Sequence, residues 1–210
     1  MNPPATVRSS TSKGEETRAQ ILAAAVEQAS ASGFESLTIG TLAEKTGLSK
    51  SGLFAHFGSR LELQIAAVDE AARQFSEMVF LPALRMPRGQ KRLDAIFENW
   101  ITWPRRAGLP GGCPLDAANK EYMHRPGPMR DAVLDRHRTL GRELIKAVQM
   151  AIDSGELRPD TDPADVTFGM FGIILACFHT ESFIGTELAM KRARTAYDRL
   201  IRHYAAAPGR

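Results

Sequence analysis

The chain contains little cysteine, few aromatic residues and no long apolar run. Its two cysteines, Cys113 and Cys177, form no C-x-x-C pair, which excludes a disulfide framework and a thiolate zinc site and suits a reducing cytosol. The most apolar stretch, FGMFGIILACF at 168–178, has about half of the roughly 20 residues that a bilayer-spanning helix needs. The opening MNPPATVRSSTSKGEE has no apolar core of the signal-peptide type. We therefore expect a cytoplasmic protein with no membrane partner.

The chain also has only a small excess of positive over negative charge. The 27 Lys and Arg against 24 Asp and Glu give a net charge of +3, which permits an anionic partner without arguing for one. Glu121, His124 and His137 do not have the compact spacing of metal ligands. The sequence also has no phosphate-cradling glycine loop, no paired Glu-x-x-His motif and no convergent nucleophile and base. We expect no metal, no cofactor and no catalytic residues.

Helical periodicity runs through most of the chain. Residues 1–14, rich in Pro, Ser, Thr and Gly with two cations, are expected to form a disordered basic arm. From Glu15 to Gly33, apolar residues recur on one helix face, and no strand-length alternation follows. The sequence therefore predicts an all-α fold. Further helices are expected at 59–80, 90–103, 114–123, 163–185 and 188–206. Another long helix, which carries Val133 and Ile152 on its apolar face, is expected to end at Gly155.

The stretch LTIGTLAEKTGLSKSGLFAHFGSR at 37–60 contains two short helices joined by a tight turn. Thr38 caps the first helix, Gly47 ends it, and Ser49 caps the second at 50–57. Two short helices joined by about three residues that include glycine form a helix-turn-helix. We expect a three-helix DNA-binding domain at 15–60, followed by a larger helical domain at 61–206.

The outer face of the second short helix is slim and mostly polar, as entry into the major groove requires. Free N–H groups at the helix start can meet phosphates or base edges, and Lys50 adds a cation. Arg60 is placed to hold the flanking DNA backbone. The candidate DNA-binding residues are Thr38, Ser49, Lys50, Ser51, Gly52, Phe54, His56 and Arg60. The alternative is a plain three-helix packing unit whose cations are only solvated.

The segment TIGTLAEKTGLSKSGLFAHFGSRLEL closely resembles the N-terminal DNA-binding region of TetR/AcrR-family transcriptional regulators, over about residues 17–63. The resemblance implies a homodimer on a near-palindromic double-stranded DNA operator, and it places the same candidate residues at DNA-facing positions. Three positions depart from the common pattern: Gly52 stands for Thr or Ser, Phe54 for Tyr, and Arg60 for Lys. The later segment GGCPLDAANKEYMHRPGPMRDAV resembles one C-terminal subtype of the family.

The resemblance also implies that residues 61–206 form a ligand-binding and dimerisation domain that binds a small-molecule effector. An apolar effector cavity needs aromatic and aliphatic walls with a few polar contacts. The candidate lining residues are Phe97, Trp100, Ile101, Trp103, Asn119, Tyr122, Met123, His137, Met170, Phe171, Ile174 and Phe178. Each of them is also a normal core residue at helical spacing, so a purely structural role stays open.

Two further features concern regulation and assembly. Cys113 lies at a helix start, where a thiol pKa can fall, so a redox sensor is weighed against a structural cysteine. Gly169 and Gly172 lie one turn apart on a helix apolar on more than one face, which favours a dimer contact completed by Tyr197 and Leu200 of the last helix. A core helix in a monomer is the alternative.

The function that these patterns favour is a ligand-responsive transcriptional regulator, most simply a repressor released by a small apolar effector. A helical-bundle binding protein or enzyme with a decorative N-terminal unit, and a nonspecific DNA-packaging protein, are the alternatives.

Overall fold

The computed structural model describes residues 13–207, so most of the expected disordered arm lies outside the described residues. Within that range every regular element is a helix, apart from one isolated antiparallel bridge between Leu157 and Ala205. The helices are α1 (Lys13–Ser32), the 3-10 turn η1 (Phe34–Ser36), α2 (Ile39–Thr46), α3 (Lys50–Phe57), α4 (Arg60–Phe75), the π-helical turn η2 (Ser76–Phe80), α5 (Leu81–Ala83), α6 (Gln90–Arg106), α7 (Pro114–Tyr122), α8 (Pro128–Asp153), α9 (Pro163–Ile184) and α10 (Thr186–Tyr204). The all-α prediction is confirmed.

The head, which we define as α1, α2 and α3, owes its short helices to local capping. Thr38 Oγ1 accepts the Thr41 N–H at 3.0 Å, and Ser49 Oγ accepts the Gly52 N–H at 3.0 Å. Gly47, at φ 70°, ends α2 in the left-handed conformation that glycine adopts without steric cost. Leu53 and Phe57 turn inward from α3, as their spacing predicted, and the other face of α3 stays outside.

Two hydrophobic cores fill the molecule, and they do not divide at residue 60. The core around α1–α3 also takes in Leu63, Ala67 and Val68 of α4. It continues into Ala118 and Tyr122 of α7 and into Met129 and Val133 of α8. The head is therefore packed directly against elements of the C-terminal half, and α7 is part of both regions.

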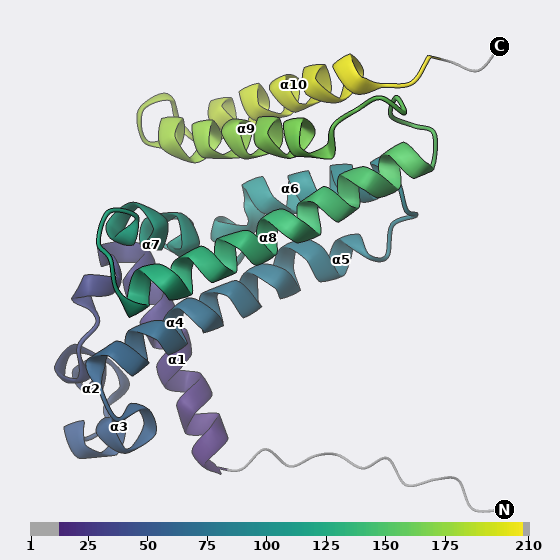
Figure 1. The fold of residues 1–210 in the computed structure, drawn as a ribbon. Helices are drawn as coiled ribbons and strands as arrows, with labels where there is room; N and C mark the ends of the chain where they lie inside the picture. Colours follow the sequence, from purple (N-terminus) through teal and green to yellow (C-terminus); the bar gives the residue numbers. More distant parts are fainter. Residues whose placement is uncertain (1–12, 208–210) are drawn as a thin grey trace, which may run out of the picture.

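Figure 1 shows the head at one end of the molecule and the α9–α10 pair on the side away from α4. Helix α4 leaves the head and continues through η2 into α5, in contact with α8. Helix α6 runs to Arg106, three residues past the expected end, with Pro104 inside it. Helix α1 begins at Lys13 rather than Glu15.

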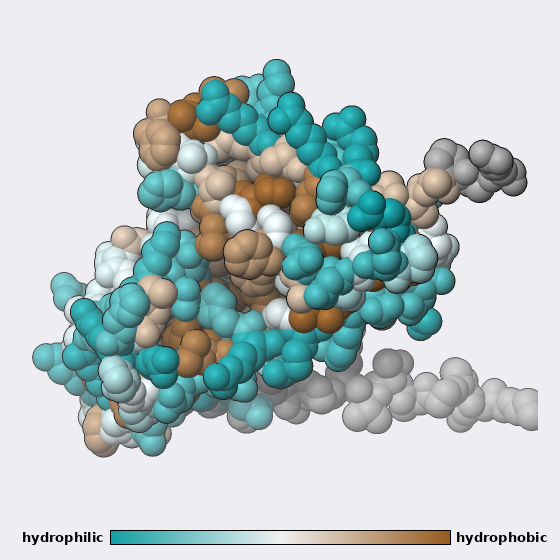
Figure 2. Space-filling view, turned by 45° about the horizontal axis from the view of Figure 1, so that its top comes forward, coloured by the Kyte–Doolittle hydropathy of each residue, from teal (hydrophilic) through white to brown (hydrophobic). Residues whose placement is uncertain are grey.

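Helix α9 is long and apolar enough to cross a membrane by length and composition, and only 22% of that apolar window is buried within the chain. Its exposed face includes Phe168 at 82% and Phe183 at 65% exposure. Figure 2 shows apolar side chains gathered on this face of the molecule, bordered by hydrophilic ones. An apolar face of this size on an otherwise hydrophilic protein is typical of a protein interface.

Candidate DNA-binding head and ligand cavity

The predicted DNA-facing residues of α3 lie on its outer surface. Ser49, Lys50, Ser51 and Phe54 are exposed, with Phe54 at 56%, while Gly52 and His56 are partly exposed. Thr38 and Lys50 line the same open groove of about 540 Å³, where the start of α2 meets the start of α3. The cap of α2 and the Lys50 cation therefore lie together on one side of the head, with Glu44 also on the groove wall. This arrangement suits an anionic, extended partner.

The Arg60 side chain forms hydrogen bonds within the protein that the sequence did not indicate. Its Nε donates to the Leu37 carbonyl at 3.0 Å, and its Nη2 donates to the Glu35 carbonyl at 2.6 Å and to the Glu35 carboxylate at 2.7 Å. These bonds fix the connector, residues 33–38, which links α1 to α2. Nη1 stays outside these bonds, so the predicted phosphate contact is confined to that nitrogen unless the network opens.

The end of α7 holds the same connector from the other side. The Glu121 carboxylate accepts the Phe34 N–H and the Glu35 N–H, both at 2.7 Å. The Tyr122 hydroxyl lies 3.2 Å from Glu35 Oε1, and burial followed by repulsion from Glu121 and Glu35 raises the pKa of Tyr122. Glu121 was considered only as a metal ligand at the sequence level; its structural role is to cap a turn.

The loop before α7 also contacts the head closely. Ser30 Oγ donates to the Gly112 carbonyl at 2.8 Å and accepts the Gly111 N–H at 3.1 Å. A Cβ on Gly111 would lie 1.8 Å from the Ser30 carbonyl oxygen, so only glycine fits there. The sequence GGCP therefore places the start of α7 against the C-terminal end of α1.

A mainly apolar, partly open cavity of about 120 Å³ lies among α4, α6, α7, α8 and α9. Half of the predicted effector residues line it, namely Trp100, Asn119, His137, Phe171, Ile174 and Phe178. The sequence analysis missed the remaining lining residues, Phe75, Cys113, Leu115, Asp116, Leu140 and Leu175. Phe75 and Leu140 do lie on the apolar helix faces, a signal that could have included them.

Six predicted effector residues lie elsewhere. Ile101, Trp103 and Met170 are buried in the main core, with Trp103 and Met170 fully enclosed. Phe97 stacks on Tyr197 with ring centroids 4.0 Å apart. Tyr122 faces the connector, and Met123 is 43% exposed at the end of α7. Helical spacing marked all six as apolar but did not show which helix neighbour each one meets.

The polar groups of the cavity cluster on α7 and α8. His137 Nε2 lies 3.2 Å from the Leu115 carbonyl oxygen, and Asp116 forms an ion pair with Lys120 at 2.7 Å. The Asn119 side-chain amide makes no hydrogen bond with any residue in 13–207. Burial raises the pKa of the Cys113 thiol to about 11, against the lowered value that a redox sensor needs. The redox hypothesis for Cys113 therefore loses its physical basis.

The predicted dimer-contact residues fall into two groups. Tyr197 is buried within its own chain and donates its hydroxyl to Asp94 at 2.8 Å, so its placement at a subunit interface was wrong. Leu200 packs on Gly169, where an added Cβ would approach the Leu200 side chain to 2.8 Å. Gly172 faces open space and lines a shallow groove of about 370 Å³ between α9 and α10.

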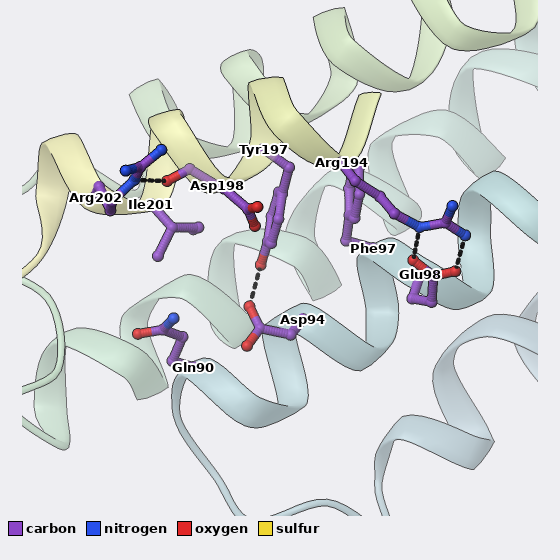
Figure 3. A pocket seen from close by; sticks show the side chains of 9 residues that line it. All are labelled: Gln90, Asp94, Phe97, Glu98, Arg194, Tyr197, Asp198, Ile201 and Arg202. Carbon is purple, nitrogen blue, oxygen red and sulfur yellow. Dashed lines mark hydrogen bonds and ion pairs between the residues drawn. The ribbon is translucent and has the colours of Figure 1, made fainter. Parts of the chain in front are cut away.

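A second, more polar cleft of about 670 Å³ opens between α6 and α10 (Figure 3). Its charged side chains largely satisfy one another: Arg194 pairs with Glu98, and Tyr197 donates to Asp94. Burial raises the pKa of Asp94, partly offset by the bond from Tyr197. Among residues 13–207 no group of three or more His, Cys, Asp or Glu side chains could hold a metal ion.

The sequence matches two family models, one over the head and one over the C-terminal half. Residues 21–67 match the model for bacterial regulatory proteins of the tetR family, and residues 89–197, more than half of the chain, match the tetracyclin repressor-like C-terminal domain. The chain belongs to the TetR family. It is a DNA-binding transcriptional regulator and not an enzyme, so the enzyme and DNA-packaging alternatives are set aside.

Several solved structures resemble most of the chain. A TetR regulator from Chloroflexus aurantiacus J-10-FL is 26% identical, with a TM-score of 0.80 over 93% of this chain and 99% of its own. AibR, solved with isovaleryl coenzyme A and operator DNA, is 20% identical with a TM-score of 0.63, over 90% of this chain and 98% of its own. A regulator from Saccharomonospora viridis in complex with choline is 16% identical with a TM-score of 0.75, over 92% and 99%. No curated protein matches the chain.

Proposed function

We propose that this TetR-family regulator is a cytoplasmic homodimeric repressor that leaves its operator when a small molecule occupies the cavity between α4, α6, α7, α8 and α9. The observation that carries the proposal is the double position of α7. Leu115, Asp116 and Asn119 line the cavity, while Glu121 of the same nine-residue helix binds the connector that leads into α2. A movement of α7 on ligand binding would therefore reach the DNA-binding head directly.

The coupling needs only a small difference in free energy. A ligand shifts the equilibrium when it binds the DNA-free arrangement more tightly than the DNA-bound one, typically by 1–3 kcal/mol. The bonds from Glu121 and Arg60 to the connector are the contacts that such a shift would change. Two structurally similar proteins support a small-molecule ligand: AibR was solved with isovaleryl coenzyme A and operator DNA, and the regulator from Saccharomonospora viridis was solved with choline.

The proposed DNA contacts are Thr38, Ser49, Lys50, Ser51, Gly52, Phe54, His56 and the free part of Arg60. The proposed dimer contact is the exposed face of α9 with the α9–α10 groove, where Gly172 and its small neighbours admit a partner helix. Dimer formation would also cover Phe168 and Phe183, whose exposure has no explanation within one chain. We further propose that GGCP at 111–114 marks a subtype of the C-terminal domain, because Gly111 permits the contact with Ser30.

Selection of duplexes from a random DNA pool by the purified full-length protein tests the proposal. We expect an inverted repeat, because two copies related by a two-fold axis present two copies of α3, with half-site centres about 10 base pairs or a multiple of one turn apart. Enrichment of a single, non-repeated site would argue against the dimer, and no enrichment at all would argue against sequence-specific binding.

A further inference from the structure

The size of the cavity limits its occupant. At about 120 Å³ it is slightly smaller than the roughly 150 Å³ engineered cavity that holds a benzene molecule in another protein. A single ring with one small substituent fits with side-chain adjustments only. A larger ligand, such as a fused-ring or acyl-chain compound, would have to extend out of the cavity or displace part of its wall.

The walls favour an aromatic ring. Phe75 and Trp100 meet edge-to-face with ring centroids 5.0 Å apart, and Trp100 meets Phe171 in the same way at 5.0 Å. Phe178 completes an aromatic set around the space. Rings in this interlocked arrangement offer both faces and edges, which an aromatic ligand satisfies better than an aliphatic one.

The polar end of the cavity is formed by His137, Asp116 and Asn119. The Leu115 carbonyl can only accept, so His137 Nε2 carries a proton in their contact. The Asp116 carboxylate also only accepts, and the Asn119 amide has no hydrogen bond within residues 13–207. No Lys or Arg lines the cavity, and the Lys120 ammonium beside it is already paired with the Asp116 carboxylate, so an anionic ligand would meet a carboxylate and no unpaired Lys or Arg.

We infer that the effector is a neutral, one-ring aromatic molecule with a hydrogen-bond-donating substituent, a phenol-like compound whose hydroxyl contacts Asn119. The inference rests on the proposed function, because it assigns a ligand class to the same cavity. It extends that proposal by excluding carboxylate ligands and by naming the residue that distinguishes a phenol from a plain arene.

Titration calorimetry of the full-length protein with phenol, toluene and benzoate tests the ligand class. We expect phenol to bind at least tenfold more tightly than toluene, and benzoate to show no measurable binding. In Asn119→Leu, which replaces the amide by an apolar side chain of similar size, the preference for phenol over toluene should fall below about threefold. Leu140→Phe, which fills the cavity, should abolish binding of both compounds.

Gln149→Leu is the matched control, because it also replaces a side-chain amide by leucine, on the exposed surface of α8, and should leave the binding of all three compounds unchanged. Benzoate binding as tight as phenol, an unchanged phenol preference in Asn119→Leu, or no binding by any probe would overturn the ligand class. The proposed function fails differently: phenol would bind as expected, yet the affinity of the protein for its selected duplex would not change.

Discussion

Single side chains link the head to the rest of the molecule, and the role of Glu121 is the one that a substitution tests most directly. Its two carboxylate oxygens each accept one backbone N–H from the connector. In Glu121→Gln one oxygen becomes an NH₂ donor and the charge is lost, so at least one of these bonds cannot form. Bonds to charged groups contribute about 1.5–3 kcal/mol each. We expect a loss of roughly 1–2 kcal/mol in unfolding free energy, measured by urea denaturation.

The same variant should show faster amide hydrogen exchange at Phe34 and Glu35, with no change in the centre of α8. Glu143→Gln, which removes the partner of Lys146 on the exposed side of α8, is the control and should leave the connector unaffected. Unaltered exchange at both amides would show that Glu121 does not hold the connector.

Cys113 provides a second residue-scale test. A thiol with a pKa of about 11 is almost entirely protonated at pH 8, whereas an ordinary cysteine thiol near 8.5 is partly ionised. We expect alkylation by iodoacetamide at pH 8 to be roughly two hundredfold slower than for a free thiol, rising about tenfold per pH unit up to pH 10.

Burial also raises the pKa of Cys177 to about 11, so Cys113→Ala identifies which cysteine reacts. The protein unfolded in guanidinium should react at the ordinary rate. A folded Cys113 that reacts as fast as a free thiol would restore the redox hypothesis.

At the scale of helices, α3 is the element whose surface is expected to meet base pairs. Lys50→Ala should weaken binding to the selected duplex by about 1–3 kcal/mol and relax the preference at one base position. Fluorescence anisotropy at fixed salt measures both effects. Lys146→Ala, on α8 far from the head, is the charge-matched control. An equal loss on selected and scrambled duplexes would make Lys50 a phosphate contact instead.

Helix α9 offers a matched pair of glycines for the dimer prediction. Gly172 and Gly141, the latter on α8, are both helical, and an added Cβ at either meets nothing within 4 Å in one chain. Alanine at each position should therefore favour helix formation slightly. Only Gly172→Ala should weaken the dimer, by about tenfold or more in sedimentation equilibrium, because the methyl group would overpack the partner helix. Equal dimer constants for the two variants would remove Gly172 from the interface.

The sequence predicted the limits of the helices better than it predicted the residues of the candidate site. The helices of the head followed from local signals, since a Thr or Ser cap and a left-handed glycine act within a few residues. The lining of the cavity did not follow from local signals. Trp103 and Phe171 both lie on apolar faces of their helices, but only Phe171 lines the cavity. The roles of Arg60 and Glu121 depend on partners 23 to 87 residues away, which no local pattern shows.

At the scale of the whole molecule, one continuous set of contacts runs from the cavity through α7 to the connector and the start of α2. The exposed face of α9 lies on a different side, so the proposed dimer contact and the contacts from α7 to the head would use different surfaces. In the proposed dimer, α9 and α10 would set the spacing of the two heads, and a movement of α7 would change their orientation.

The ratio of affinities for the selected duplex and a scrambled duplex of equal length, measured at one salt concentration, tests the central claim most directly. Specific regulators bind their sites roughly 10³-fold or more tightly than nonspecific DNA. We predict a ratio of that order for the full-length protein. A ratio near one, with both affinities falling equally as salt rises, would contradict sequence reading by α3.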